Sequence, residues 1–546
     1  MEIKRKTMIK GTYMKRPLLT LLLFAACALT IISCGNCGSG CRHQAKTICY
    51  VPIDDRPVNC ERVEYLCAAV GFDLLMPEKE LTGTRLDNME PFEGGRTCGD
   101  RQALFEWLKA CEGKCDYYVL SLDQLLSGGL VSSRWLAGED ISFEQQVCDY
   151  VRNLSLRYPV ILFDTVMRFA STVGYGGYDY TQYNALREYG MKPRKVLQGA
   201  DLSPENIVAA YGISPSGQSI AHPGLNEEQL QRYFASRRRK LLLAQSILQG
   251  QSNFDWVFLG VDDTAPGNNI QSNELEYLGT LLGPNGCIGT ACDDLGLMSI
   301  ARVALQEYGP VQVDIRYFGG KQMENADSYN YLSLEEDIAQ KFKFMGLQYA
   351  DAPREDCLTV LVLTRAESPQ AYDNARAELL ATARDMLDAG LPLCVVDANS
   401  GEPHYNPATM LGKELIDSGI PLLELLGFSC WNTASNAVGI GFSTSAARYA
   451  YLRAGRPSRS SNRAFVQSMA FCYLKDISYK YCGFRADRFD STAPYSYNYV
   501  LERLNASPVA TSFSPLRTAP HGPVSVSNFR YPWNRTFEAL FDVNVD

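Results

Sequence analysis

From Thr47 onward the chain alternates short β-like apolar runs with amphipathic helical stretches, and this alternation constrains its fold more than any other feature. Parallel strands need long crossover connections, which are usually helices. We therefore predict an α/β fold with mostly parallel strands. For the N-terminal part we favour a barrel-like, TIM-type arrangement over an open doubly wound sheet.

Seven strands are predicted first, at 48–53, 72–76, 117–122, 160–163, 256–261, 287–291 and 311–317. Three more follow at 358–363, 393–396 and 425–430, with helices at 227–248, 369–389 and about 437–453. A polar stretch containing Pro353 divides the two groups. The sequence thus predicts an α/β domain over 47–350, a second α/β part over 351–455, and a C-terminal portion over 456–546 that packs back on the core.

The first 33 residues have the features of a bacterial lipoprotein signal peptide. Lys15 and Arg16 precede an apolar run over 18–32, and Ser33 stands directly before Cys34. The run is shorter than the roughly 20 residues that span a bilayer, which argues against an uncleaved anchor. We expect a lipid on Cys34, a linker over 34–46, and a place in the cell envelope, on the periplasmic side rather than the cell surface. Contact with the membrane is expected through this lipid alone.

The charge and the cysteines exclude some classes of protein. The leader carries a net charge of +5, so its removal takes the formal charge from −9 to −14. Such an acidic chain repels phosphate backbones, so we expect no nucleic-acid partner. The four histidines are scattered singly, and we predict no metal site and no cofactor. The pairs Cys37/Cys41, Cys111/Cys115, Cys287/Cys292 and Cys472/Cys482 are close enough to form disulfides, but sequence alone does not assign them.

Aspartates follow six of the predicted strands. They are Asp54, Asp55, Asp123, Asp164, Asp262, Asp263, Asp293, Asp294 and Asp397. Because parallel strands end at one edge of a sheet, we expect most of these carboxylates to form one acidic rim, with Arg56, Arg134 and Arg168 between them. A single aspartate at such a position is commonly a helix cap, and Asp293 is most simply interpreted in that way.

Asp262 and Asp263 are the first candidates for catalysis, followed by Asp55 and Asp123. Asp262 and Asp263 directly follow a predicted buried strand over 256–261, and a loop with Pro266 and Gly267 comes after them. Crowded carboxylates raise one another's pKa, so one can donate a proton while another stays ionised. This is the equipment of glycoside hydrolysis, although the same cluster would also suit a divalent cation. The alternative is that Asp262 only caps a turn and Asp263 is solvated.

A second polar group is predicted to bind substrate. Its members are Asp54, Arg56, Arg134, Asp164, Arg168, Asp397, Asn399, Trp431, Asn432 and Asn436. The loop over 431–436 precedes a helix and offers amides, hydroxyls and an indole to sugar hydroxyls or an anion. It could instead satisfy its own polar groups through Asx turns. A weaker signal lies at 532–538, where Arg535 and Glu538 are expected to pair with each other.

Six segments together resemble one family. They are VPIDDRPVN, SLDQLLSGGLVSSR, VFLGVDDTAPG, GTACDDLG, the 431–436 loop with its glycine-bearing helix, and PWNRTFE. Together they resemble the uncharacterised bacterial family known as domain of unknown function 4127, over about residues 47–538. The resemblance implies no established reaction. Asp294 and Ser127 depart from the glutamate and the aromatic residue that similar chains favour, so no direct role is assigned to either.

We therefore expect a periplasmic, lipid-anchored carbohydrate-active hydrolase, a glycosidase that uses paired aspartates on a small-molecule or oligosaccharide substrate. The alternative is a non-catalytic lipoprotein that binds a glycan or another solute with the same polar rim. The number of acids favours the enzyme, because an unpaired carboxylate that binding does not need costs stability.

Overall fold

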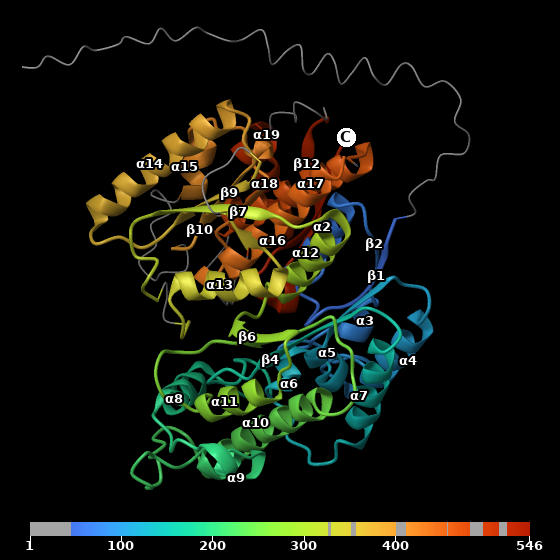
Figure 1. Ribbon diagram of the computed structural model, residues 1–546, viewed down its shortest axis with the longest axis vertical. Coiled ribbons are helices and arrows are strands. Elements are labelled where there is room, and N and C mark those ends of the chain that lie inside the picture. Colours follow the sequence, from blue (N-terminus) through green and yellow to red (C-terminus); the bar gives the residue numbers. More distant parts are fainter. Residues whose placement is uncertain are drawn as a thin grey trace, which may run out of the picture. The chain divides into compact units, whose positions relative to one another are not determined.

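The computed structural model describes residues 45–325, 329–350, 356–399, 411–455, 457–480, 495–512 and 521–546. The predicted signal peptide and the lipidation site Cys34 lie outside the described residues. Lys46–Asp546 cluster as one unit, shown as a ribbon in Figure 1. None of the described helices is long and apolar enough to cross a bilayer.

Six strands of the first half form one parallel sheet. They are β1 (Thr47–Val51), β2 (Asp73–Leu75), β3 (Tyr117–Ser121), β4 (Val160–Val166), β5 (Trp256–Val261) and β6 (Gly286–Thr290). Their order is β2-β1-β3-β4-β5-β6, and every neighbouring pair is parallel. β4 and β5 are buried along their whole length, as expected for strands covered on both faces.

The α/β class with mostly parallel strands is confirmed, but the strand order differs from the favoured barrel. In a TIM-type barrel the second strand lies between the first and the third. Here β1 takes that place and pairs with both β2 and β3. β2 has only three residues and begins with the exposed Asp73, so it suits the edge of an open sheet. The order is that of a doubly wound sheet, the alternative to the barrel.

Five strands form a second parallel sheet. They are β7 (Gln312–Phe318), β8 (Gln348–Tyr349), β9 (Leu358–Leu363), β10 (Leu393–Asp397) and β11 (Gly427–Ser429), in the order β11-β10-β9-β7-β8. β7 was expected beside the first six strands, but it pairs with β8 and β9. Counted within each sheet, both follow the order 2-1-3-4-5 of flavodoxin-like sheets, and β6 extends the first.

Helices cover both sheets. Those of the first half are α2 (Glu61–Ala69), α3 (Lys79–Thr82), α4 (Arg101–Cys111), α5 (Leu122–Ser127), α6 (Leu130–Ser133), α7 (Ser142–Ser155), α8 (Tyr180–Met191), α9 (Pro204–Ala210), α10 (Glu227–Leu248) and α11 (Ser272–Leu281). Those of the second half are α12 (Leu295–Tyr308), α13 (Leu334–Met345), α14 (Pro369–Asp388), α15 (Leu411–Asp417), α16 (Ala434–Arg453), α17 (Arg459–Cys472), α18 (Tyr497–Asn505) and α19 (Pro508–Ser512). A π-helix, η5 (Tyr473–Tyr479), continues α17.

Two helices, α12 and α16, join the sheets. α12 leads from β6 to β7, α16 follows β11, and the two pack along each other. A methyl group on Gly439 of α16 would lie 1.8 Å from Asp294 Oδ2 beside the start of α12, so only glycine fits there. Ser435 in the first turn of α16 donates to the carbonyl of Thr290 at the end of β6, at 2.8 Å. The loop before α16 is thereby brought to the C-terminal end of the first sheet.

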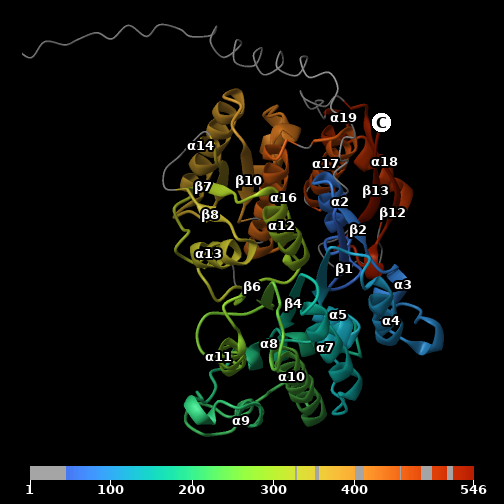
Figure 2. The ribbon, with the colours of Figure 1, turned by 45° about the vertical axis from the view of Figure 1, so that its right-hand side comes forward.

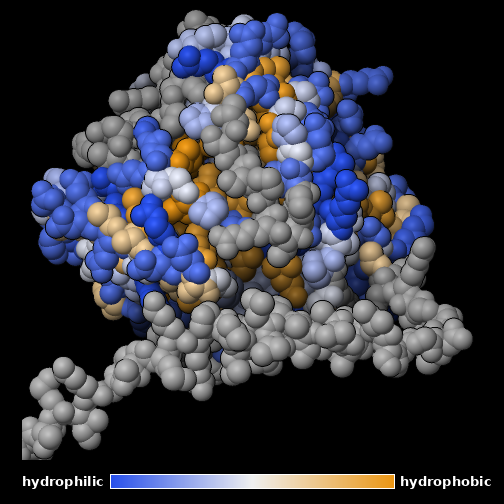
Figure 3. Space-filling model, turned by 90° about the horizontal axis from the view of Figure 1, so that it is seen from above, coloured by the Kyte–Doolittle hydropathy of each residue, from blue (hydrophilic) through white to orange (hydrophobic). Residues whose placement is uncertain are grey.

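The C-terminal segment adds a third layer beside α18 (Figure 2). β12 (Val524–Arg530) and β13 (Leu540–Val545) form an antiparallel pair. Between them lie the 3₁₀ turn η6 (Pro532–Asn534) and the residues up to Glu538. On the face shown in Figure 3, hydrophilic residues dominate the rim and apolar ones gather toward the middle.

The cysteines that sequence proximity made candidates for disulfides are free thiols where they are described. These are Cys111, Cys115, Cys287, Cys292 and Cys472. Cys37, Cys41 and Cys482 lie outside the described residues.

Candidate active site

A cavity of about 340 Å³ lies at the C-terminal ends of the strands in the first sheet. Its lining comes from the segments after β1, β3, β4, β5 and β6, from the segment between β7 and α13, from the loop before α16 together with its first turn, and from the segment between β12 and β13. In doubly wound folds ligands bind at this edge of the sheet. Its volume is at the lower end of the roughly 300–1,000 Å³ of small-molecule sites.

Seven residues that the sequence assigned to a site line this cavity together. They are Arg56, Arg134, Arg168, Asp262, Asp263, Asn432 and Asn436. The parallel strands explain the convergence, because all of the strands deliver their C-terminal residues to one edge. The 431–436 loop arrives from the other sheet through the packing of α16 on α12.

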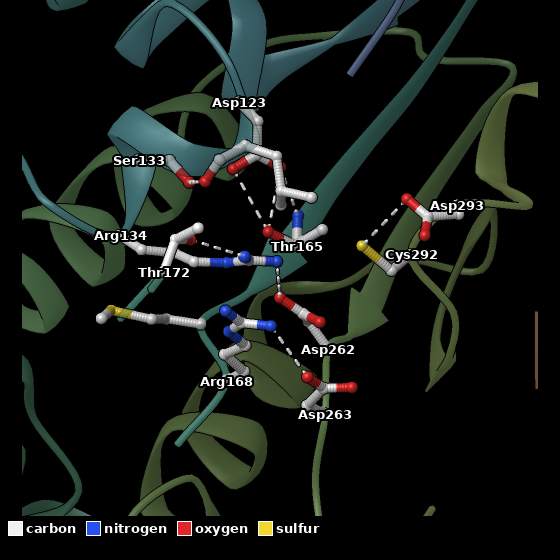
Figure 4. A network of polar contacts seen from close by, with 12 residues as sticks. Asp123, Ser133, Arg134, Thr165, Arg168, Thr172, Asp262, Asp263, Cys292 and Asp293 are labelled. Carbon is white, nitrogen blue, oxygen red and sulfur yellow. Dashed lines mark hydrogen bonds and ion pairs between the residues drawn. The ribbon is translucent and has the colours of Figure 1, made fainter. Parts of the chain in front are cut away.

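Each of the three arginines binds a carboxylate of the cavity. Arg134 is ion-paired with Asp262 and also donates to Thr172 Oγ1 at 3.1 Å. Arg168 Nη1 donates to Asp263 Oδ2 at 2.9 Å. Figure 4 shows the two arginine side chains extended side by side toward the two adjacent aspartates. These charge-assisted contacts fix where both carboxylates point.

Arg56 holds a third acid, Asp293. Its guanidinium contacts both oxygens of Asp293, Nη1 lying 3.3 Å from Oδ2, and Nη2 also lies 2.7 Å from Asp54 Oδ2. Asp54 is completely buried and supports Arg56 from behind the cavity wall. The expected capping role of Asp293 is wrong. Asp294 stands at the cap position, where it accepts from the Cys292 amide at 3.2 Å and from Lys341 Nζ at 2.6 Å.

Two carboxyl groups of the cavity are easier to protonate than ordinary aspartates. Burial raises the pKa of Asp262, and Arg134 only partly opposes this effect. Burial likewise raises the pKa of Asp293 to about 6 against the opposing charge of Arg56. The pKa of each group therefore lies closer to neutral pH than the pKa of a solvated aspartate. Asp263 is more exposed and is held by its ion pair with Arg168.

The backbone is strained at three lining residues. Asp263, Asn432 and Trp533 have φ values of 28°, 64° and 56°, in the left-handed region that favours glycine. Such residues cost of order 1–3 kcal/mol each and cluster at functional sites. Successive strand residues normally point to opposite faces. The turn at Asp263 lets its side chain and that of Asp262 line the same cavity.

Two predicted acids, Asp123 and Asp164, lie below the sheet edge and do not line the cavity. Lys240 on α10 bridges them, with Nζ 2.5 Å from Asp123 Oδ1 and 2.6 Å from Asp164 Oδ1. The backbone amide of Thr165 donates to Asp123 Oδ2 at 3.0 Å. Burial raises the pKa of Asp164, whereas for Asp123 burial is outweighed by Lys240 and the pKa falls. These three residues form a structural charge cluster.

Asp55 also lies outside the lining, in a neighbouring cavity of about 320 Å³. Trp533 belongs to the walls of both cavities, and its Nε1 donates to Asp55 Oδ1 at 2.8 Å. Burial raises the pKa of Asp55 to about 6, and the bond from Trp533 opposes this shift. The guanidinium of Arg56 lies 4.9 Å from the Trp533 ring centre on the first cavity's side.

Three predicted binding residues of the second half are not part of the lining. Asp397 is buried at the end of β10, and its Oδ1 accepts from the backbone N–H of Asn399 at 3.0 Å. Burial raises the pKa of Asp397 to about 6. Trp431 is completely buried, with Lys475 Nζ 4.7 Å from its ring centre. It lies outside the lining, directly before the lining residue Asn432.

Several lining residues were not assigned to a site from the sequence. They are Thr172, Tyr180, Tyr183, Cys292, Asp293, Trp533, Phe537 and Glu538. The segment over 532–538 was noticed, but its proposed Arg535–Glu538 pair differs from the contacts observed. Arg535 donates to the Val173 carbonyl, and Glu538 Oε2 lies 2.8 Å from Lys475 Nζ. The polar and aromatic motif PWNRTFE, residues 532–538, is the feature of the sequence that could have identified this part of the cavity lining.

Within the described ranges, no three His, Cys, Asp or Glu side chains gather in a way that could hold a metal ion. A family model described as "Protein of unknown function (DUF4127)" matches residues 48–542. No curated protein matches the chain.

Proposed function

The chain belongs to the DUF4127 family, whose description states no activity, and from the chemistry of the cavity we propose that it hydrolyses a glycosidic bond. The observation that carries the proposal is the mixture of acids in one cavity. Asp262 has a raised pKa, while its neighbour Asp263 is ion-paired with Arg168. Glycosidases need this combination of a protonated and an ionised carboxyl group.

The two acids take different roles. Asp262, which is 4% exposed, donates a proton to the oxygen of the departing sugar. Asp263, held by its ion pair with Arg168, stabilises the positive charge that develops on the sugar ring as the glycosidic bond breaks. Water then adds to the sugar carbon and returns a proton to Asp262. Arg134 orients the Asp262 carboxyl group through their ion pair. Arg134 also limits how far the pKa of Asp262 rises.

Other lining residues suit a sugar. Asn432 and Asn436 present amides that can both donate to and accept from hydroxyl groups. Trp533, Phe537 and Tyr180 supply aromatic surface for the apolar faces of a ring. Aromatic surface combined with planar polar groups fits a carbohydrate better than a wholly apolar ligand.

A glycosidase screen tests this proposal. The purified protein would be incubated with a panel of 4-nitrophenyl glycosides and with plant and host glycans, and the products would be measured by absorbance and chromatography. We expect cleavage of at least one member. Tight binding of a glycan without cleavage of any member would contradict catalysis and support a non-catalytic, glycan-binding lipoprotein.

We also propose that a lipid on Cys34 anchors the mature chain in the bacterial cell envelope, facing the periplasm. The proposal rests on the basic and apolar leader that ends at Ser33. In cells grown with labelled palmitate we expect the parent to take up label and the Cys34→Ala variant to take up none. Equal labelling of both would exclude Cys34 as the site.

A further inference from the structure

Glu538 is the least satisfied acid in the wall of the cavity. It is 2% exposed, and neither oxygen of its carboxyl group accepts a hydrogen bond from the described residues. Lys475 Nζ lies 2.8 Å from Oε2, close enough for an ion pair but without the alignment of a hydrogen bond. Its side chain nevertheless lines the cavity.

Another buried glutamate has the hydrogen bonds that Glu538 lacks. Glu274, which is 3% exposed, accepts from Arg237 Nε at 2.9 Å and from the Tyr211 hydroxyl at 2.7 Å. Burying a carboxylate without such partners costs desolvation free energy that no hydrogen bond within the protein offsets. Hydrogen-bond donors of a bound ligand would offset this cost.

The residues that support Glu538 lie on an irregular helix. Lys475 and Asp476 lie on the π-helix η5, and Lys475 Nζ is 3.6 Å from Asp476 Oδ1. Arg62 from α2 is ion-paired with the same Asp476 carboxylate. Short π-helical segments occur frequently at functional sites. The segment therefore holds the Lys475 ammonium against Glu538 from behind the cavity wall.

The charges around Glu538 indicate which donors would fit. Two acids, Glu538 and Asp293, face two cations, Arg56 and Lys475. A cationic ligand would be repelled by Arg56 and Lys475, and an anionic ligand by the two acids. Neutral hydroxyl groups donate to a carboxylate without disturbing this balance. Arg134 and Arg168, which also line the cavity, are likewise matched by Asp262 and Asp263. The lining residue Arg535 donates to the Val173 carbonyl.

We infer that the cavity takes a neutral, polyhydroxylated unit such as an unmodified hexose, and that Glu538 accepts hydrogen bonds from its hydroxyl groups. This inference rests on the proposed function only in that it treats the cavity as the ligand site. It adds the class of sugar and a residue that recognises it.

Binding measurements on the full chain test the class of sugar. D-glucose, D-galactose and D-mannose would be compared with D-glucuronate, D-galacturonate and D-glucosamine by saturation-transfer NMR titration. We expect at least one neutral hexose to bind at least about tenfold more tightly than each charged sugar, the effect of one charge-assisted hydrogen bond or charge mismatch. Preferred binding of a charged sugar, or no binding by any member, would overturn the inference.

Two variants test the role of Glu538. Glu538→Gln is expected to weaken hexose binding by about tenfold or more. Glu538→Gln also leaves Lys475 without the Glu538 carboxylate. The double variant Lys475→Met/Glu538→Gln therefore removes both members of the ion pair, a change that proteins often tolerate. It should keep the melting temperature of the parent and still bind weakly. Parental affinity in the stable double variant would show that Glu538 is only a structural partner of Lys475.

The matched control is Glu144→Gln. Glu144 is 3% exposed and ion-paired with Arg101 and Arg239, away from the cavity. It should lose stability and keep the parent's affinity; an equal loss of affinity would overturn the assignment of Glu538. Cleavage plays no part in these measurements. A protein that binds a neutral hexose and hydrolyses nothing would contradict the proposed function and support this inference.

Discussion

The Asp262→Asn variant is expected to lose roughly 10²–10⁴-fold in turnover on any glycoside that the parent cleaves, the usual contribution of a general acid. Asparagine keeps the shape and an acceptor for Arg134, but its amide N–H groups are not acidic enough to transfer a proton to the leaving oxygen. Asp263→Asn should cause a loss in the same range, because the charge beside the sugar ring disappears. Initial rates at matched protein concentration measure both effects.

The pH profile separates the acid from a residue that only binds. Because only the protonated carboxyl group can donate, the parent's rate should fall as the pH rises through the raised pKa of Asp262. In Asp262→Asn this alkaline decline should be absent from the residual activity. A decline that persists unchanged would assign the donor elsewhere, with Asp293 as the next candidate, since its pKa is raised to about 6.

A control is needed for the lost ion pair, since Asp262 is bound to Arg134. Asp294→Asn serves this purpose, because Asp294 is also buried and paired, with Lys341, but does not line the cavity. We expect Asp294→Asn to lower the melting temperature and to keep turnover. Full activity in both Asp262→Asn and Asp263→Asn would exclude this pair as the catalytic acids.

The convergence of the strand-end residues could be predicted from the sequence for a simple physical reason. Parallel strands all end at one edge, so aspartates that follow apolar runs meet there whether the sheet is open or closed. Arg134, Arg168 and Asp262, which were placed at this edge on the same basis, line one cavity. The strand order was predicted less well, because buried strands of a barrel and of a doubly wound sheet have the same short apolar sequence pattern.

Which acid faces the cavity depends on contacts that are distant in sequence. Asp293 and Asp294 are adjacent, yet Lys341 and the close approach of Gly439 hold Asp294 at the helix start. Asp293 is left to face Arg56, 237 residues away in sequence. Nothing in the local pattern around these two aspartates distinguishes them.

Tertiary packing also determines which of the two tryptophans lines the cavity. The sequence predicts Trp431 as a binding residue and gives Trp533 only a weaker signal. Trp431 is instead completely buried outside the lining, with Lys475 Nζ 4.7 Å from its ring centre. Trp533 instead lines the cavity, because the segment between β12 and β13 folds back onto the loop after β1 and donates to Asp55. The sequence predicted that the C-terminal portion packs back on the core, but it did not predict this position, since the segment over 531–539 has no hydrophobic periodicity.

The second large effect is expected from Lys240→Met, which should lower the free energy of unfolding by about 3–5 kcal/mol. Lys240 is the cation between Asp123 and Asp164, and all three side chains are at most 9% exposed. Its removal leaves two buried carboxylates without their partner, and methionine can replace only the apolar stem of the lysine. Urea denaturation at pH 8 measures the loss.

The loss should shrink as the pH falls. Without Lys240 the pKa of both buried acids lies above its unfolded value, so the folded variant binds more protons than the unfolded chain, and its stability rises toward acid. The difference between variant and parent should therefore be smaller at pH 5 than at pH 8. Lys109→Met, which removes a surface pair with Glu106, should cost about 0–1 kcal/mol at both values. An equally small, pH-independent effect of Lys240→Met would contradict a buried charge cluster beneath the site.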